Sequence, residues 1–125
     1  MANEKLTITL TGRAPVTVNK GQWPIIASAK WHDGGEFEHR ANRHRSLVVR
    51  QHDDGRTIVY GVYSTNWQGE LDARGGELLT VNGADADNIG DAAQVIAAIY
   101  RVADYLQFDR HFADRCIADL PAEEL

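Results

Sequence analysis

Two runs of β-favouring residues flank an aspartate–glycine pair near the middle of the chain, in the stretch SLVVRQHDDGRTIVYGVYS over residues 46–64. Aspartate–glycine between such runs is the strongest short-range signal of a β-hairpin, because a tight two-residue turn needs a positive φ at both central positions. If Asp54 and Gly55 are those two residues, Val49 lies opposite Tyr60. The hairpin therefore commits part of the fold to an antiparallel sheet.

The predicted register sorts the hairpin into two faces, because side chains alternate across a sheet. The face expected in the core carries Leu47, Val49, Gln51, Ile58, Tyr60 and Val62. The other face is basic and aromatic, and carries His44, Ser46, Val48, Arg50, His52, Thr57, Val59 and Tyr63. A slip of one residue would change the pairing between strands, although each strand would keep its own alternation.

The chain before the hairpin predicts two further strands. Residues 6–11 alternate apolar residues with threonine, which is typical of a half-buried strand. Its inward side chains would be Leu6, Ile8 and Leu10. Val16–Asn19 resumes as a second strand, and Pro15 suits its start because proline cannot donate to a sheet ladder.

The segment that follows is less regular. Asn19 and Gln22 have the spacing of a helix capping box, which predicts a short helix over Lys20–Ala29, with a short strand as the alternative. Glu36–Ala41 is expected to be an edge strand, where its charges would discourage unwanted pairing.

After the hairpin, the sequence predicts a loop and then two helices. Thr65–Gly76 is polar and rich in glycine and carries Trp67, and Glu77–Thr80 predicts a short strand or turn. Apolar residues recur at three- and four-residue steps over Asp87–Leu106, which indicates an amphipathic helix. A second, shorter helix is expected over Asp109–Asp119.

The order of these elements predicts an α+β fold over residues 1–125, forming a single domain. We expect a meander-like antiparallel sheet with one face covered by the C-terminal helices and the other left partly open. No run approaches the roughly 18 apolar residues that span a bilayer, and the first residues, MANEKLTITL, lack the apolar core of a signal peptide. With a single cysteine as well, the sequence favours a cytoplasmic protein without membrane contact.

Charge is distributed unevenly along the chain. The net charge is −5, but residues 84–125 hold nine acids and three arginines, a net −6, which leaves +1 for the rest. Within that rest, His39–His52 holds four arginines, three histidines and no acid. The overall acidity argues against a dedicated non-specific nucleic-acid binder.

No motif of established chemistry is present. The sequence lacks HExxH, GxSxG and the glycine-rich phosphate loops, so we predict no catalytic residue, no metal site and no cofactor. Cys116 falls at a core position of the second helix and is expected to be a small buried apolar residue. A small enzyme with an unrecognised site of acids and histidines, in which Glu36 with Glu38 or Asp53 with Asp54 could be the paired acids, is kept as an alternative.

The basic stretch is the best candidate for a binding surface. Arginine offers planar donors for carboxylate or phosphate, and tyrosine and tryptophan can pack on a partner or stack on a base. The candidate residues are Arg40, Arg43, Arg45, Arg50, His52, Tyr63 and Trp67. They would engage an acidic protein surface or a second copy of the chain. Nucleic acid bound by the same residues, and a solvated face without a partner, are the alternatives.

Four short stretches carry a resemblance: QHDDGRTIVYGVYS, NWQGE, RGGELL and CIADLPAEEL. In these the chain resembles small uncharacterised proteins encoded by proteobacterial plasmids, phages and integrated elements. The resemblance implies no activity and no site residue. It implies a context, in which an accessory protein of a mobile element binds and modulates host or element machinery.

Overall fold

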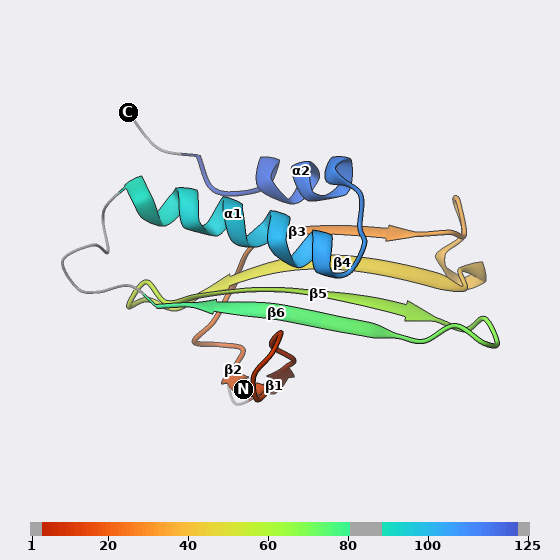
Figure 1. The fold of residues 1–125 in the computed structure, drawn as a ribbon, viewed down its shortest axis with the longest axis horizontal. Coiled ribbons are helices and arrows are strands. Elements are labelled where there is room, and N and C mark those ends of the chain that lie inside the picture. The colour runs from red at the N-terminus through yellow and green to blue at the C-terminus, as the bar shows by residue number, and fades with distance from the viewer. Residues whose placement is uncertain (1–3, 81–88, 123–125) are drawn as a thin grey trace.

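A four-stranded antiparallel sheet with two helices on one face forms the centre of the structure (Figure 1). The computed structural model describes residues 4–80 and 89–122, so the first two residues of the predicted helix 87–106 lie outside the described residues. The strands follow in the order β3 (Ile25–His32), β4 (Arg43–Gln51), β5 (Thr57–Thr65) and β6 (Ala73–Leu79). The covering helices are α1 (Ile89–Tyr105) and α2 (Arg110–Ala118). The predicted α+β class, with a meander under C-terminal helices, is confirmed.

The main hydrophobic core lies between this sheet and the helices. Leu47, Val49 and Val59 contribute fully buried side chains from the sheet. The helices contribute apolar residues at helical spacing, namely Val95, Ala98, Ile99, Val102, Ala103, Phe112, Ala113 and Cys116. α2 begins after Asp109, whose carboxylate accepts a hydrogen bond from Phe112 N at 2.8 Å and so caps the helix.

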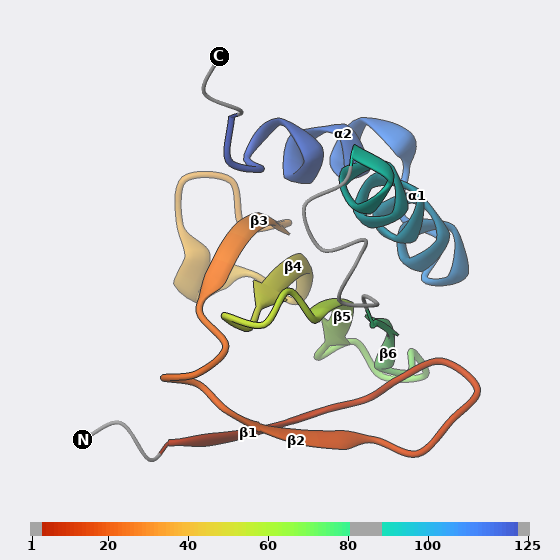
Figure 2. The ribbon, with the colours of Figure 1, turned by 90° about the vertical axis from the view of Figure 1, so that its left-hand side faces the viewer.

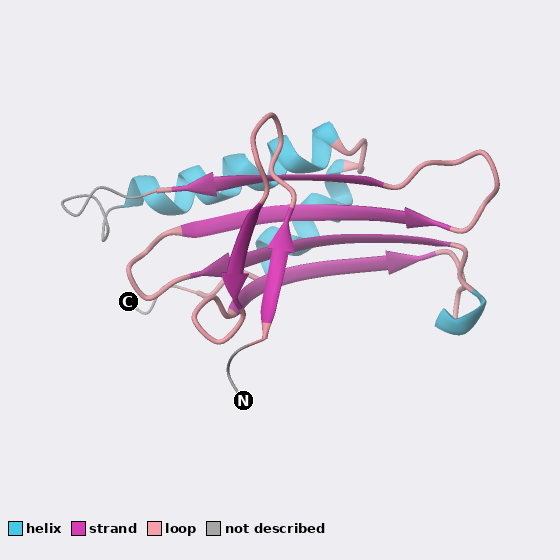
Figure 3. Ribbon diagram, turned by 90° about the horizontal axis from the view of Figure 1, so that it is seen from below, coloured by secondary structure: helices cyan, strands magenta, loops and turns pink. Residues whose placement is uncertain are grey.

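A second hairpin crosses the opposite face of the sheet (Figures 2 and 3). It is formed by β1 (Lys5–Ile8) and β2 (Val16–Asn19). Its buried side chains form a second core with the sheet, made of Ile8, Leu10, Val18, Trp23 and Ile58. Ile8 and Leu10 face inward as predicted. The expectation of a partly open sheet face is wrong where this hairpin packs, and four consecutive residues of β4, 47–50, are buried as a result.

Three expected elements differ from the structure. The helix over Lys20–Ala29 is wrong, and its alternative is correct, because the segment forms β3 and pairs with β4. Pro24 lacks the amide proton that a helix interior needs, whereas extended residues after it complete the sheet. Glu36–Ala41 contains a short 3₁₀ helix, η1 (Glu38–Arg40), in place of an edge strand. The predicted loop 65–76 ends early, since β6 begins at Ala73.

The central hairpin forms, but its turn has three residues where two were expected. His52 N donates to Arg56 O at 2.9 Å, Gly55 N donates to His52 O at 2.9 Å, and Gly55 has a φ of 94°. A three-residue loop that ends on a left-handed glycine is the next most common hairpin type. The register therefore slips by one, and Val49 pairs with Val59.

This slip exchanges the two faces of β5. Val59 and Tyr63, expected on the open face, lie on the side of the helices, whereas Ile58 and Tyr60 pack with the N-terminal hairpin. Leu47 and Val49 keep their predicted place in the helix-side core. The alternation within each strand thus survives, and only the relation between the strands is wrong.

Candidate interaction site

The predicted basic face does not exist as one surface. Arg50 is buried, with 8% of its surface exposed, beneath the segment that leads from β2 into β3. Its Nε donates to Tyr60 Oη at 3.0 Å and its Nη1 to Trp23 O at 2.9 Å. The placement of Arg50 on an open, cationic sheet face is therefore wrong. Its charge is used inside the protein to satisfy a buried carbonyl.

His52 also lies apart from the other candidate residues, at the β4–β5 turn. Its ring packs 5.3 Å from that of Trp23, and its Nδ1 accepts a hydrogen bond from Asp54 N at 3.1 Å. Both Arg50 and His52 thus stabilise the turn and the hairpin core.

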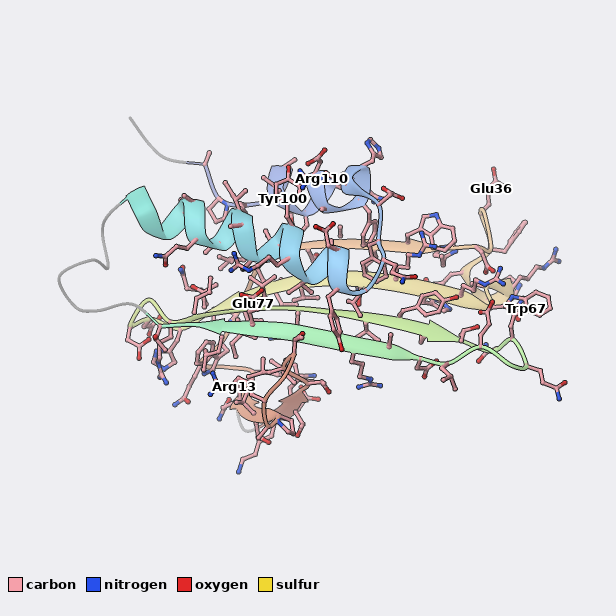
Figure 4. All side chains as sticks on the ribbon, in the orientation of Figure 1. Arg13, Glu36, Trp67, Glu77, Tyr100 and Arg110 are labelled. Atoms are coloured by element: carbon pink, nitrogen blue, oxygen red, sulfur yellow. The ribbon has the colours of Figure 1, made fainter. Side chains whose placement is uncertain are left out.

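The other five candidates gather at the opposite end of the sheet, which we call the loop end. It comprises the connections 33–42 and 66–72 together with the adjoining ends of β3, β4 and β5. The sheet projects here beyond the corner between α1 and α2, and Glu36 and Trp67 mark this end in Figure 4. Arg40, Arg43, Arg45, Tyr63 and Trp67 all belong to it.

Each of three arginines at the loop end lies over an aromatic ring. The Arg40 guanidinium carbon is 4.8 Å from the ring centre of Phe37, and that of Arg43 is 5.5 Å from Trp67. Arg45 lies 4.5 Å from Trp31 and 5.8 Å from Phe108. Stacking of this kind fixes a guanidinium plane and leaves its edge free to donate.

Glu70 ties β4, β5 and the 66–72 loop together. It accepts hydrogen bonds from Arg43 Nε at 3.1 Å and Nη2 at 2.6 Å, from Thr65 Oγ1 at 2.7 Å and from Tyr63 Oη at 3.0 Å. These donors, with Arg43 foremost, lower the pKa of Glu70 to about 2. The Glu70 carboxylate accepts hydrogen bonds from all of these donors and stays ionised at neutral pH. Its role is therefore structural, and it is poorly suited to act as an acid or a base. No pattern in the sequence singled it out.

A two-part cleft opens between the loop end and the α1–α2 corner, with Arg45 in the walls of both parts. The larger part, about 520 Å³, is lined by Arg45, Tyr63, Glu70, Leu71, Ala73, Tyr105, Leu106, Gln107 and Phe108. The smaller part, about 320 Å³, is lined by Trp31, Arg45, Asp109, His111, Phe112 and Arg115. We call this concave region the Arg45 cleft.

Exposed apolar side chains concentrate around the same region. Among large apolar residues that the described ranges 4–80 and 89–122 leave exposed, Phe37, Trp67, Leu71 and Tyr105 lie at the loop end or on the rim of the Arg45 cleft. Leu71 is 86% exposed, and it is the grouping of such side chains, not a single exposed leucine, that is informative. Leu71, Tyr105 and Phe37 were not among the predicted site residues.

Neither Cys116 nor Asp54 is well placed for catalysis. Cys116 is completely buried, and burial raises the pKa of its thiol to about 11. Asp54 is bonded to Arg56, whose backbone N–H lowers the pKa of the carboxyl. Within the part of the chain that the structure describes, no three histidine, cysteine or acidic side chains are grouped to hold a metal ion.

Comparisons with known proteins returned no match: no family model, no curated protein and no solved structure is similar enough to the chain. The resemblance to proteins of mobile elements therefore stays a prediction. Neither helix in the described ranges is both long and apolar enough to cross a membrane.

Proposed function

We propose that this protein binds another protein at the loop end, with the Arg45 cleft receiving part of the partner. The observation that carries the proposal is that exposed Leu71 and Tyr105 line a cleft with Arg45 in both of its parts, while exposed Trp67 lies at the same end of the sheet. Aromatic residues and arginine are enriched at the energetic centres of protein interfaces, where they fill or frame pockets. A role as an accessory protein of a mobile element fits this proposal and rests on the sequence resemblance alone.

Charge favours a protein over a nucleic acid as the partner. Arg43 is paired with Glu70 at 2.6 Å, and Arg50 is buried, so two of the four arginines in the basic stretch offer no free charge. Arg40 is accompanied by the exposed acids Glu36 and Glu38. A nucleic-acid surface needs several uncompensated cations to replace counterions along the phosphates.

Shape favours a different protein over a second copy. A two-fold contact uses the same patch on both subunits, so it would set one concave Arg45 cleft against another. Each edge of the sheet is also bonded to another segment of the chain, because Ser28 N of β3 donates to Asp119 Oδ2 at 2.9 Å and Thr11 N donates to Gly76 O of β6 at 2.8 Å. The docked segment is therefore expected to project into the cleft and not to extend the sheet.

The test is selection of binding peptides from a random display library on the wild-type protein. We expect enriched peptides to lose at least tenfold in affinity on Leu71→Ser and Tyr105→Ser. They should bind normally to Ile25→Ser, which removes a 52% exposed apolar side chain elsewhere on the surface. Failure to enrich any peptide, or equal binding to all variants, would overturn the proposal.

Two further measurements address the alternatives. Titration with single- and double-stranded DNA and RNA at low salt should show no binding. Binding that falls steeply with salt would favour the nucleic-acid alternative. Sedimentation of the wild-type protein should show a monomer, and a dimer lost in Leu71→Ser would favour a second copy.

A further inference from the structure

We propose that the Arg45 cleft is a carboxylate-binding pocket that takes an acidic side chain of the partner protein, next to an apolar one. This deepens the proposed function and rests on it for the nature of the partner. The juxtaposition that points to it is an oriented, unpaired guanidinium that lines both parts, or chambers, of the cleft, with exposed Leu71 and Tyr105 in the larger one.

Arg45 differs from four arginines whose guanidinium groups are bonded within the protein. Arg43 is bonded to Glu70, Arg101 to Glu77, and Arg56 to Asp54, while Arg50 donates to Trp23 O and Tyr60 Oη. Arg45 is partly buried between Trp31 and Phe108, yet its guanidinium forms no hydrogen bond or ion pair with any residue that the structure describes. An arginine whose guanidinium plane is fixed and whose N–H donors are free is oriented to bind a carboxylate or phosphate through two parallel hydrogen bonds.

The smaller chamber holds a second guanidinium, that of Arg115. It lies 5.7 Å from the ring centre of Phe112, and a single hydrogen bond, from Nη2 to Lys30 O at 3.3 Å, uses one of its five N–H donors. His111 also lines this chamber. The smaller chamber therefore has guanidinium N–H donors that are not used within the protein.

The two acidic residues that line the cleft already accept hydrogen bonds within the protein. Asp109 accepts from Phe112 N as the helix cap, and Glu70 is bonded to Arg43, Thr65 and Tyr63. Neither carboxylate is bonded to Arg45. A partner carboxylate would thus meet a cation without having to displace an internal one.

The size and lining of the two chambers define what would be bound. About 320 Å³ beside Arg45 and Arg115 accommodates a carboxylate with its side chain, and the larger chamber offers Leu71, Ala73 and Tyr105 to a neighbouring residue. The predicted recognition element is an acidic residue followed or preceded by an apolar one.

The experiment follows the Arg45 Nε–H and Trp31 indole N–H signals in ¹⁵N spectra during titration with acetyl-Gly-Glu-Leu-Gly-amide. The matched probe acetyl-Gly-Gln-Leu-Gly-amide has the same shape without the charge. We expect the glutamate peptide to bind at least tenfold more tightly, a preference that Arg45→Gln abolishes. Arg45→Lys should weaken it because lysine lacks the planar fork.

Arg110→Gln is the control. Arg110 lies 4.3 Å from the ring centre of Tyr100, the same kind of stacking, but it is exposed and lines neither part of the cleft (Figure 4). It should bind both peptides like the wild type. Equal affinity for the two peptides, or an unchanged preference in Arg45→Gln, overturns the carboxylate pocket.

A third probe, inorganic phosphate, separates a peptide carboxylate from a free anion. Phosphate that binds at Arg45 more tightly than the glutamate peptide overturns the assignment to a protein side chain. The outcome is independent of the display experiment. Selected peptides that need Leu71 and Tyr105 but carry no acid would leave the proposed function in place and remove only this inference.

Discussion

Arg50 shows how a residue that sequence patterns assign to a surface can belong to the interior. Replacing it by methionine leaves Trp23 O and Tyr60 Oη without their charged donor. We expect Arg50→Met to lower the free energy of unfolding by about 2 kcal/mol. Urea denaturation measures this, with exposed Arg74→Met expected to stay within about 0.5 kcal/mol of the wild type. Unchanged stability in Arg50→Met, or loss of peptide binding at the loop end, would contradict this role.

Glu70 gives the loop end a defined dependence on pH. Folding lowers its pKa from the ordinary 4.5 to about 2, so the unfolded chain binds the proton more readily. The contribution of Glu70 to stability is complete above pH 4.5 and is lost as the pH falls towards 2. In Glu70→Gln, the free energy of unfolding measured in urea should therefore fall less steeply over that range.

The cause of this shift can be checked separately. Arg43 is the largest contributor to the lowered pKa of Glu70. Arg43→Gln should return that pKa towards 4.5, as followed by ¹³C NMR of the carboxyl carbon. A pKa that stays near 2 would show that Thr65 and Tyr63 suffice.

At the scale of elements, Gly61 sets how closely α1 approaches the sheet. A Cβ at this position would lie 2.6 Å from Leu106 Cδ1 and 3.0 Å from Ser46 O. We expect Gly61→Val to destabilise the protein by about 2 kcal/mol through overpacking, and Gly61→Ala by less. In a double-mutant cycle with Leu106→Ala, the two changes should be less than additive, because shortening Leu106 makes room. Strict additivity would argue against direct contact.

The two hairpins and both helices could be predicted because short-range signals define them. Asp54-Gly55 predicts a turn, but it fits both a two-residue loop and the three-residue loop that begins at Asp53. The difference exchanges the faces of the next strand, and no local preference separates the two. The helix predicted over Lys20–Ala29 is wrong for a related reason. The capping-box spacing at Asn19 favours a helix, but pairing with β4 favours a strand, and the sequence alone does not reveal that pairing.

At the scale of the whole molecule, the candidate site could be predicted only in part. Strand alternation alone puts Arg43 and Arg45 on one face of β4. Tyr63 joins them only in the observed register, in which it pairs with Arg45, because the predicted two-residue turn put Tyr63 on the opposite face. Tyr105, Phe108 and Arg115 reach the cleft from the two helices and the turn between them, far along the chain. Their arrival depends on where the α1–α2 corner packs on the sheet, which is a tertiary property.

The same packing of α2 protects the molecule from edge-to-edge association. Along β3, two of the backbone groups that face away from β4 are bonded: Ser28 N donates to Asp119 Oδ2, and Lys30 O accepts from Arg115 Nη2. Open strand edges are templates for pairing with another chain. Asp119→Ala should therefore produce concentration-dependent self-association in sedimentation velocity, whereas Asp104→Ala, which removes an exposed acid from α1, should not. If both variants sediment like the wild type, the packing of α2 shields the edge and the Asp119 carboxylate is not needed for it.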